Sequence, residues 1–181
     1  MRGAMTAMTQ GKPPLDFRLP DEAATLALGA TLARALLAID AAIRAQGLTV
    51  HLEGNLGAGK TTLVRGVLRE LGVDGAVKSP SYTLLEPYEL SRLHLYHFDF
   101  YRFKNPREFS DAGFSEYFGP GAVCMVEWPG KAGEFLPGAD LRITLQALDT
   151  GRHAAVGAST EIGTACRDQL ETFLREAAAG A

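Results

Sequence analysis

The sequence is poor in cysteine, with only Cys124 and Cys166, and their spacing matches neither a CxxC pair nor a zinc-binding pattern. We therefore expect two reduced thiols rather than a disulfide framework. No apolar run approaches the ~20 residues that cross a bilayer. Residues 1–14 also lack the apolar stretch of a secretory signal. These absences predict a cytoplasmic protein with no membrane association.

The chain has no basic excess, since 18 Lys and Arg stand against 21 Asp and Glu, for a formal net charge of −3. Proteins that bind nucleic acid on their own usually carry a basic excess, so autonomous binding to DNA or RNA is disfavoured. Hydrophobic residues make up 46% and charged residues 22% of the 181 positions, a globular composition. We expect a flexible tail at residues 1–14 and a single domain over residues 15–181.

Helical and extended apolar patterns alternate along the chain, which predicts the α/β class. We expect a three-layer domain in which helices flank a mixed, mainly parallel sheet and a C-terminal hairpin supplies the antiparallel part. The strand expected at residues 48–54 alternates apolar and polar residues, as a half-exposed strand would. The other expected elements are helices at 21–47, 60–72 and 160–178, strands at 93–103 and 122–128, and a hairpin of residues 141–145 and 152–156.

A glycine-rich segment follows the strand predicted at residues 48–54 and opens the next helix. It fits G-x-x-x-x-G-K-[ST] at every fixed position, which predicts a phosphate-binding P-loop. In such a loop, backbone N–H groups surround the phosphates of ATP, Lys60 neutralises phosphate oxygens, and the Thr61 hydroxyl ligates Mg²⁺. The expected nucleotide-binding segment comprises Gly54, Asn55, Leu56, Gly57, Ala58, Gly59, Lys60, Thr61 and Thr62.

Two acidic residues end apolar runs that we expect to be strands. Asp99 follows residues 95–98 and Glu127 follows residues 122–126, so both should reach the sheet edge beside the P-loop. A P-loop needs a carboxylate for its metal, and a second can orient the attacking water. Because Glu127 ends the more apolar run, we expect its strand to be the more central and the nearer to the loop.

The Pro-punctuated segment 78–83 offers Ser79, Ser81 and Thr83, and a hydroxyl there either senses the γ-phosphate or belongs to an ordinary polar loop. Trp128 is either a stacking surface or a packed strand-end aromatic. His94 and His97 show no ligand pattern, and no role is predicted for them.

The motifs GNLGAGKTTL, VKSPSYTLLEPY, YHFDFYRF and VEWPG, in this order, closely resemble the bacterial tRNA threonylcarbamoyladenosine biosynthesis ATPase family (TsaE/YjeE). The resemblance implies a single-domain P-loop ATPase that helps to install threonylcarbamoyl on the adenosine next to the anticodon. It also implies binding to the TsaB–TsaD complex, which performs the transfer, and only indirect contact with tRNA. ATP hydrolysis would support turnover of that assembly and be weak without it.

The resemblance also assigns residues. Lys60 and Thr61 hold phosphate and Mg²⁺, and Asp99 and Glu127 are the acidic residues of H-x-D and V-E-W. The remaining positions are Ser81 and Thr83 in a switch-like segment, Trp128 in V-E-W, and Glu22 and Arg152 near the nucleotide base. Two alternatives remain open: a small-molecule or nucleotide kinase, and a nucleotide-dependent binding module with little hydrolysis.

Overall fold

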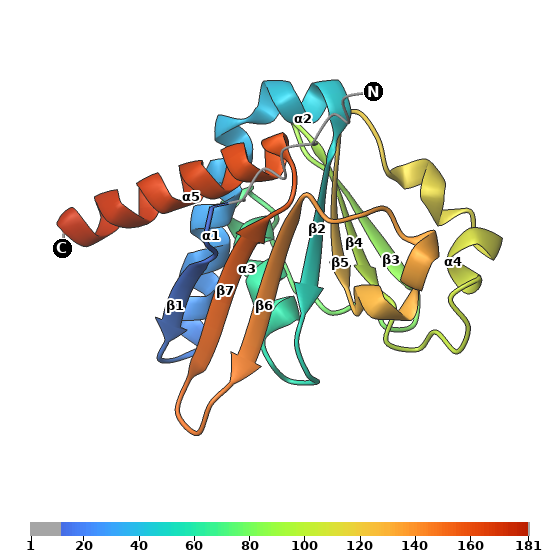
Figure 1. Cartoon of the computed structure of the whole chain (residues 1–181), viewed down its shortest axis with the longest axis horizontal. Helices are drawn as coiled ribbons and strands as arrows, with labels where there is room; N and C mark the ends of the chain where they lie inside the picture. Colours follow the sequence, from blue (N-terminus) through green and yellow to red (C-terminus); the bar gives the residue numbers. More distant parts are fainter. Residues whose placement is uncertain (1–11, 181) are drawn as a thin grey trace, which may run out of the picture.

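The computed structural model describes residues 12–180, whose strands form one seven-stranded sheet in the order β1-β7-β6-β2-β5-β4-β3 (Figure 1). The strands are β1 (Leu15–Leu19), β2 (Leu48–Glu53), β3 (Leu85–Glu89), β4 (His94–Asp99), β5 (Ala122–Glu127), β6 (Leu141–Ala147) and β7 (Arg152–Ala158). The central strands β6, β2, β5 and β4 run parallel, and β1, β7 and β3 pair antiparallel with their neighbours. The predicted mixed, mainly parallel sheet and its C-terminal hairpin are confirmed.

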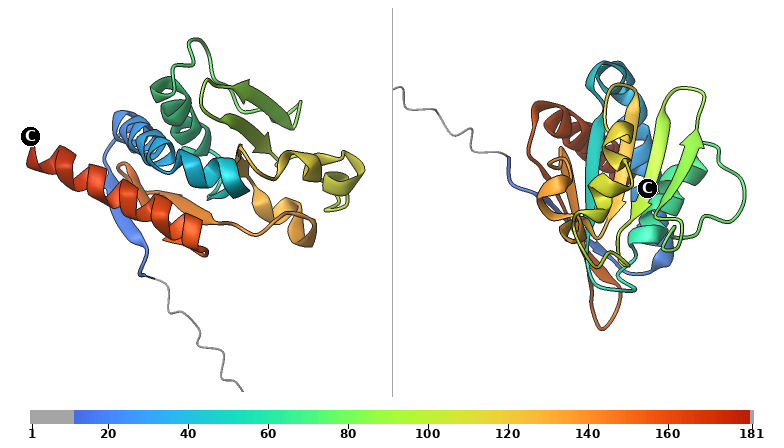
Figure 2. Two further views of the ribbon diagram at one scale, coloured as in Figure 1. Left: turned by 90° about the horizontal axis from the view of Figure 1, so that it is seen from above. Right: turned by 90° about the vertical axis from the view of Figure 1, so that its right-hand side faces the viewer.

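Helices cover both faces of the sheet. On one face, α1 (Glu22–Ala38) contacts both α3 (Lys60–Glu70) and α5 (Glu161–Ala179), and their apolar side chains share one core with the strands (Figure 2). The other face of β4 and β5 packs against a cluster of phenylalanines held by short helical elements. These are α4 (Glu108–Asp111) and the 3₁₀ helices η1 (Phe114–Tyr117), η2 (Pro129–Lys131) and η3 (Gly133–Phe135).

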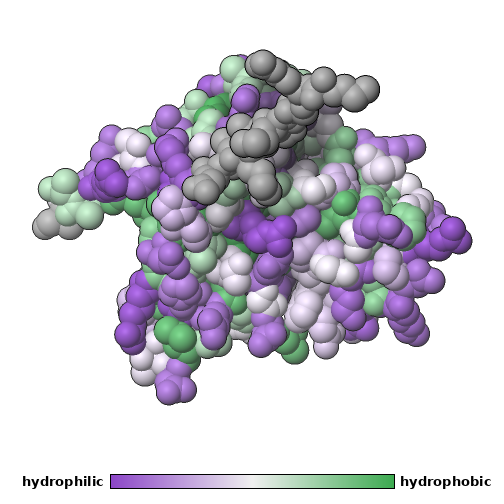
Figure 3. All heavy atoms as spheres, viewed as in Figure 1, coloured by the Kyte–Doolittle hydropathy of each residue, from purple (hydrophilic) through white to green (hydrophobic). Residues whose placement is uncertain are grey.

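The second face of β6 is open to water. Along this strand, buried and exposed side chains alternate, with Arg142, Thr144 and Gln146 exposed. Figure 3 shows hydrophilic residues spread over the side of the molecule on which β6 and β7 lie. The domain therefore has three layers at the centre of the sheet, where both faces are covered, and two layers toward β7, where one face is exposed.

The single helix predicted for residues 21–47 is wrong, because the chain breaks at Ile39 into α1 and α2 (Asp40–Gln46). Asp21 caps α1 as expected, its side chain accepting a hydrogen bond from the backbone N–H of Ala24 at 2.8 Å. The break bends the chain by 72° and lets α2 bury Ile43 at the end of the sheet. No single helix within residues 12–180 is long and apolar enough to span a membrane.

Strand β2 lies in the middle of the sheet, and its alternating pattern does not reflect exposure to water. The polar side chains of Thr49 and His51 are each only 8% exposed. The loop before β6 runs beside these two residues. The carbonyl oxygen of Pro137, in this loop, lies 3.1 Å from Nε2 of His51. Burial lowers the pKa of His51 below its ordinary value. The strand predicted before the P-loop is therefore confirmed, and its polar positions are buried because a loop takes the place of solvent.

The N-terminal residues that are described pack against α5. Lys12 Nζ forms an ion pair with Asp168 at 2.6 Å, and Arg167 donates to the carbonyl of Pro13 at 2.7 Å. Strand β1, which no sequence pattern indicated, begins at Leu15 and pairs with β7. Of the tail expected at residues 1–14, residues 1–11 lie outside the described part of the chain.

Both cysteines are free and buried, as expected for reduced thiols. Cys124 lies on β5 and Cys166 on α5. Burial raises the pKa of the Cys166 thiol to about 12, so its reactive thiolate form is disfavoured at neutral pH.

Helices α1 and α3 approach so closely that only glycine fits at their crossing. A Cβ on Gly66 would stand 2.3 Å from the carbonyl oxygen of Leu26, and one on Gly29 would stand 2.3 Å from that of Leu63. We expect Gly66→Ala to lower the free energy of unfolding by about 2 kcal/mol, because overpacking outweighs the better helix propensity of alanine. Urea unfolding measures this change. The control is Gly157→Ala, whose Cβ would meet no atom within 4 Å; equal stability of the two variants would contradict the crossing geometry.

Candidate active site

The P-loop joins β2 to α3 at the carboxyl edge of the parallel strands, as the motif predicted. Its backbone requires glycine at Gly54, which has φ of 145° and whose Cβ would lie 2.3 Å from the carbonyl of Leu145. The turn closes with a hydrogen bond from the N–H of Ala58 to the carbonyl of Asn55 at 3.1 Å. Helix α3 then begins at Lys60, so its N-terminal N–H groups face the cavity beside the loop.

A cavity of about 330 Å³ lies beside this loop and collects most of the residues singled out from the sequence. The predicted residues that line it are Leu56, Gly57, Gly59, Lys60, Thr61, Thr62, Ser81, Asp99, Glu127, Trp128 and Arg152. Ser79, Tyr101 and Arg102 line it as well. Gly54, Asn55 and Ala58 form the loop without lining the cavity, and Glu22 and Thr83 lie outside it.

The Lys60 ammonium is held against the loop. Nζ donates to the carbonyls of Gly54 at 2.7 Å and Asn55 at 3.0 Å, and it lies 4.2 Å from the centre of the Trp128 ring. Burial lowers the pKa of Lys60, and the nearby negative charges of Glu127 and Asp99 oppose that shift. The side chain is 4% exposed, so its charge acts in a partly desolvated site where it stabilises anions strongly.

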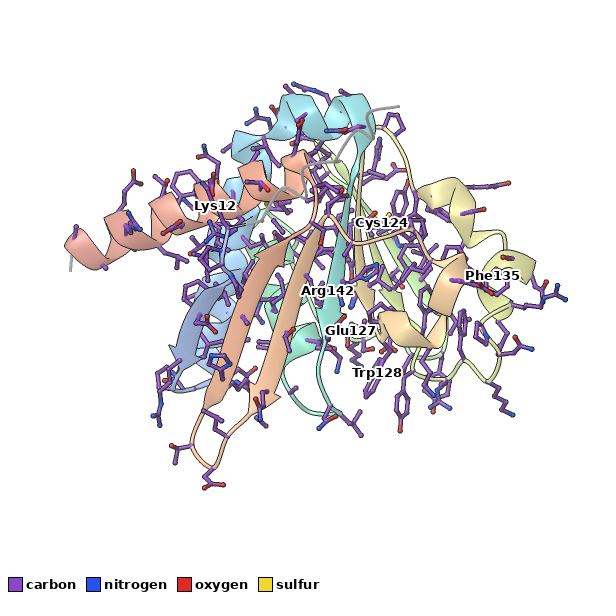
Figure 4. The ribbon with its side chains drawn as sticks, in the orientation of Figure 1. Lys12, Cys124, Glu127, Trp128, Phe135 and Arg142 are labelled. Atoms are coloured by element: carbon purple, nitrogen blue, oxygen red, sulfur yellow. The ribbon has the colours of Figure 1, made fainter. Side chains whose placement is uncertain are left out.

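Glu127 lies at the end of β5, next to the P-loop strand, as its apolar run predicted. Its side chain is 4% exposed, and Oε1 accepts a hydrogen bond from the Thr61 hydroxyl at 2.8 Å. Nε2 of His97 lies 2.9 Å from the same oxygen. Figure 4 shows Glu127 and Trp128 together at this edge of the sheet. The structure thus joins the hydroxyl of the P-loop to a buried carboxylate of the neighbouring strand.

Asp99 stands beside Glu127, because the two residues are register partners of the parallel strands β4 and β5. Its carboxylate is 3% exposed and accepts hydrogen bonds from the Ser79 hydroxyl and from the backbone N–H of Tyr101, the latter at 2.9 Å. Ser79 was only one of three candidate hydroxyls in the sequence. The expectation that both carboxylates emerge at one edge is confirmed.

The hydroxyl-bearing segment divides between two cavities. Ser81 lines the cavity beside the P-loop, whereas Thr83 lines a neighbouring cavity of about 260 Å³ with Tyr82 and Tyr88. The Arg102 guanidinium lies 4.0 Å from the centre of the Tyr82 ring, which connects this segment to the chain after β4. Arg102 carried no signal of its own in the sequence beyond its place in the Y-R motif.

Of the two residues expected near a nucleotide base, Arg152 lines the cavity and Glu22 does not. Arg152 lines the cavity and donates to the Thr25 hydroxyl at 3.0 Å. Glu22 instead forms an ion pair with Arg65 at 3.2 Å, and its side chain is 61% exposed. The start of α1 therefore acts on the cavity indirectly: Thr25 holds the lining residue Arg152, whereas Glu22 does not line the cavity.

Trp128 is placed by an unusual backbone conformation. Its φ is 58°, a left-handed value that turns the chain sharply at the end of β5. The ring is half-buried, and its centre lies 5.0 Å from that of Tyr101. Its position is compatible with both expected roles, a stacking surface and a packed aromatic at a strand end. The ring packs on Lys60 and Tyr101, and it also lines the cavity.

The oxygen donors of the site suit a hard divalent cation. The Thr61 hydroxyl and the carboxylates of Asp99 and Glu127 are the donor type that Mg²⁺ prefers. In the described part of the chain, no three His, Cys, Asp or Glu residues cluster to form a metal centre. A cation here would therefore take several of its ligands from phosphate and water, which is how Mg²⁺ binds in P-loop proteins.

Comparisons with known proteins agree on one family. A profile described as "Threonylcarbamoyl adenosine biosynthesis protein TsaE" matches residues 19–154. The tRNA threonylcarbamoyladenosine biosynthesis protein TsaE of Haemophilus influenzae is 39% identical over 80% of this chain and 90% of its own length. The protein of the same name from Bacillus subtilis is 40% identical over 62% of this chain and 70% of its own length.

A solved structure supports the same relationship. The crystal structure of Bacillus subtilis YdiB superposes with a TM-score of 0.71 and 31% sequence identity, covering 88% of this chain and 95% of that one. The observed P-loop NTPase fold is thus shared with a relative that is similar along nearly the whole chain. The chain belongs to the TsaE family.

Proposed function

We propose that this chain is a Mg²⁺-dependent ATPase that serves threonylcarbamoyl modification of the adenosine next to the anticodon of tRNA. The names of its relatives, all tRNA threonylcarbamoyladenosine biosynthesis proteins, support the pathway. One observation carries the ATPase proposal: the 2.8 Å hydrogen bond between the P-loop Thr61 hydroxyl and the buried Glu127 carboxylate. This pairing supports the proposal because a P-loop metal site needs a hydroxyl and an acidic group close together beside the phosphates.

Each part of the cavity then has a role. The loop N–H groups and Lys60 would bind the phosphates of ATP, while Thr61, Asp99 and Glu127 would hold Mg²⁺ directly or through its waters. Bound Mg²⁺ would neutralise charge on the β- and γ-phosphates. Glu127 also accepts a hydrogen bond from the attacking water. The water oxygen bonds to the γ-phosphorus as the bond to the bridging oxygen breaks, and the water's proton passes to the released phosphate.

The remaining lining residues support nucleotide recognition. Ser81 lines the same cavity as the P-loop, where its hydroxyl can sense the γ-phosphate, and the half-buried Trp128 ring offers a stacking surface. Arg152, held by Thr25 and lying beside Gly59 of the P-loop, would contact the nucleotide from the wall of the cavity. Glu22 and Thr83 would reach it only if their segments moved, since neither lines the cavity.

The resemblance supports a cytoplasmic protein whose partner is the TsaB–TsaD complex. Its ATP hydrolysis supports turnover of that complex and is weak in isolation. The test is to incubate the protein with ATP and Mg²⁺, alone and with TsaB–TsaD, and to follow both phosphate release and phosphoryl transfer. Phosphate release stimulated by the complex supports the proposal. Transfer to a small acceptor would instead indicate a kinase, and nucleotide binding without release would indicate a binding module.

We expect the isolated protein to bind tRNA weakly and with a shallow dependence on salt. The formal net charge is −3, so few phosphate contacts and little counterion release are available. Fluorescence anisotropy with labelled tRNA at two salt concentrations, about 50 and 200 mM, measures both quantities. Tight binding by the protein alone, with a steep salt dependence, would contradict indirect contact.

A further inference from the structure

Strand β4 carries a buried imidazole that no role assigned above uses. His97 is fully buried, and it lies on the same face of β4 as Leu95 and Asp99, because side chains alternate along a strand. Its register partner on β5 is Met125, so its neighbours on this face are mostly apolar. A polar ring in such a place is unfavourable unless it is hydrogen-bonded.

The single hydrogen bond of this ring is to the proposed catalytic carboxylate. Nε2 lies 2.9 Å from Oε1 of Glu127, whereas Nδ1 has no partner within residues 12–180. Because a carboxylate only accepts, Nε2 carries the hydrogen and donates it. The imidazole is therefore oriented by Glu127 alone, and Glu127 in turn is held by the ring.

Two donors meet the same oxygen of Glu127. The Thr61 hydroxyl reaches Oε1 at 2.8 Å from the P-loop side, and His97 reaches it from β4. Both bonds turn Oε1 toward the protein, so the other oxygen, Oε2, is directed to the cavity that Glu127 lines. A rigid donor at this point restricts the carboxylate to one orientation, as partners behind metal ligands and catalytic groups do elsewhere.

We propose that His97 is a positioning residue that holds the Glu127 carboxylate with Oε2 facing the attacking water and the metal. This inference rests on the proposed ATPase function, because it assigns His97 a part in the same site. His97 touches no substrate in this role; it acts only through Glu127. It should therefore affect turnover much more than nucleotide affinity.

The test compares variants that differ in their ability to donate at the Nε2 position. We expect His97→Leu to lower turnover with TsaB–TsaD by about 10- to 100-fold, while the Kd for ATP stays within about threefold. His97→Gln, whose amide nitrogen reaches the same position, should recover most of the loss. His97→Asn, whose amide nitrogen does not reach the Nε2 position, should not recover the lost turnover. If the leucine variant fails to fold, the comparison of the Gln and Asn variants still tests whether a donor at this position matters. Equal turnover of the Gln and Asn variants would overturn the proposal.

A second mutation tests whether His97 acts through Glu127. In a Glu127→Gln background, adding His97→Leu should change turnover by less than about twofold, because neighbours that act as one unit are non-additive. Losses that multiply would overturn the proposal. If Glu127→Gln alone hydrolyses ATP like the parent, the proposed function fails and this inference with it. If only His97→Leu behaves like the parent, this inference alone fails.

The chain offers a matched control. His51 is also a buried histidine on a parallel strand, but its Nε2 meets the carbonyl of Pro137 rather than a carboxylate. We expect His51→Leu to leave turnover within about twofold of the parent, with any change confined to thermal stability. A loss equal to that of His97→Leu would show that burying any leucine in this sheet impairs turnover, and it would overturn the positioning role.

Discussion

Replacing Lys60 with alanine is expected to abolish high-affinity ATP binding while the fold survives. The ammonium belongs to the first residue of α3, and it donates to the carbonyls of Gly54 and Asn55 in a partly desolvated cavity. Removing such a charge from a phosphate site costs about 3 kcal/mol, which corresponds to about 100-fold in Kd. Isothermal titration with ATP and Mg²⁺ measures the loss.

Lys131 provides the control for this variant. It is exposed, lies in η2 and does not line the cavity, so Lys131→Ala makes the same change in net charge without touching the phosphates. We expect its Kd for ATP to stay within about twofold of the parent, since exposed charges are screened. Circular dichroism and thermal unfolding of both variants check that the fold is intact. Near-normal ATP binding or turnover by Lys60→Ala would refute the P-loop assignment.

Replacing Glu127 with glutamine is expected to lower ATP turnover by at least about 100-fold, with little change in ATP affinity. The amide keeps the shape of the side chain, and its oxygen can still accept from Thr61 and His97. What it loses is the negative charge to which we assign the orientation of the attacking water and the attraction of the metal. A loss confined to turnover identifies an interaction made mainly in the transition state. Phosphate release in the presence of TsaB–TsaD, together with the Kd for ATP, gives the comparison.

Two further substitutions make this prediction specific. Asp99→Asn should weaken the response to Mg²⁺ and turnover together, because Asp99 lies beside Glu127 but meets Ser79 and Tyr101 instead of the P-loop hydroxyl. Glu53→Gln is the matched control, since Glu53 ends the adjacent strand β2 but pairs with Arg142 at 2.6 Å outside the cavity. Its turnover should stay close to that of the parent. If both the Glu127 and Asp99 variants hydrolyse ATP normally, neither carboxylate is catalytic.

The strongest sequence signals were local ones. The G-x-x-x-x-G-K-T segment prescribes a loop between a strand and a helix because its glycines, lysine and threonine are adjacent in the chain. The apolar run before Glu127 likewise indicated a strand buried on both faces, and β5 is buried at every position. Position at a strand end was enough to bring Asp99 and Glu127 to the same edge. These expectations required no knowledge of which strands are neighbours.

Sequence reasoning failed where a contact partner lies far along the chain. The break at Ile39 follows from the fit of α2 against the end of the sheet, and the burial of β2 follows from the loop around Pro137. Strand β1 pairs with β7, more than a hundred residues later, and a short segment such as Leu15–Leu19 has no strong pattern of its own. Two signals were available for His97. It is the histidine of the H-x-D motif, and its spacing of two residues from Asp99 places both on the same face of β4.

The sequence by itself determined the fold class, the P-loop and the two strand-end carboxylates, because each depends on residues that are neighbours in the chain. Only the tertiary structure decided which oxygen meets which donor: Thr61 and His97 on Glu127, and Ser79 on Asp99. It also left Thr83 and Glu22 outside the cavity. The physical reason is that a hydrogen bond of 2.8 or 2.9 Å depends on strand order and register, which are set by packing across the whole sheet rather than by local sequence.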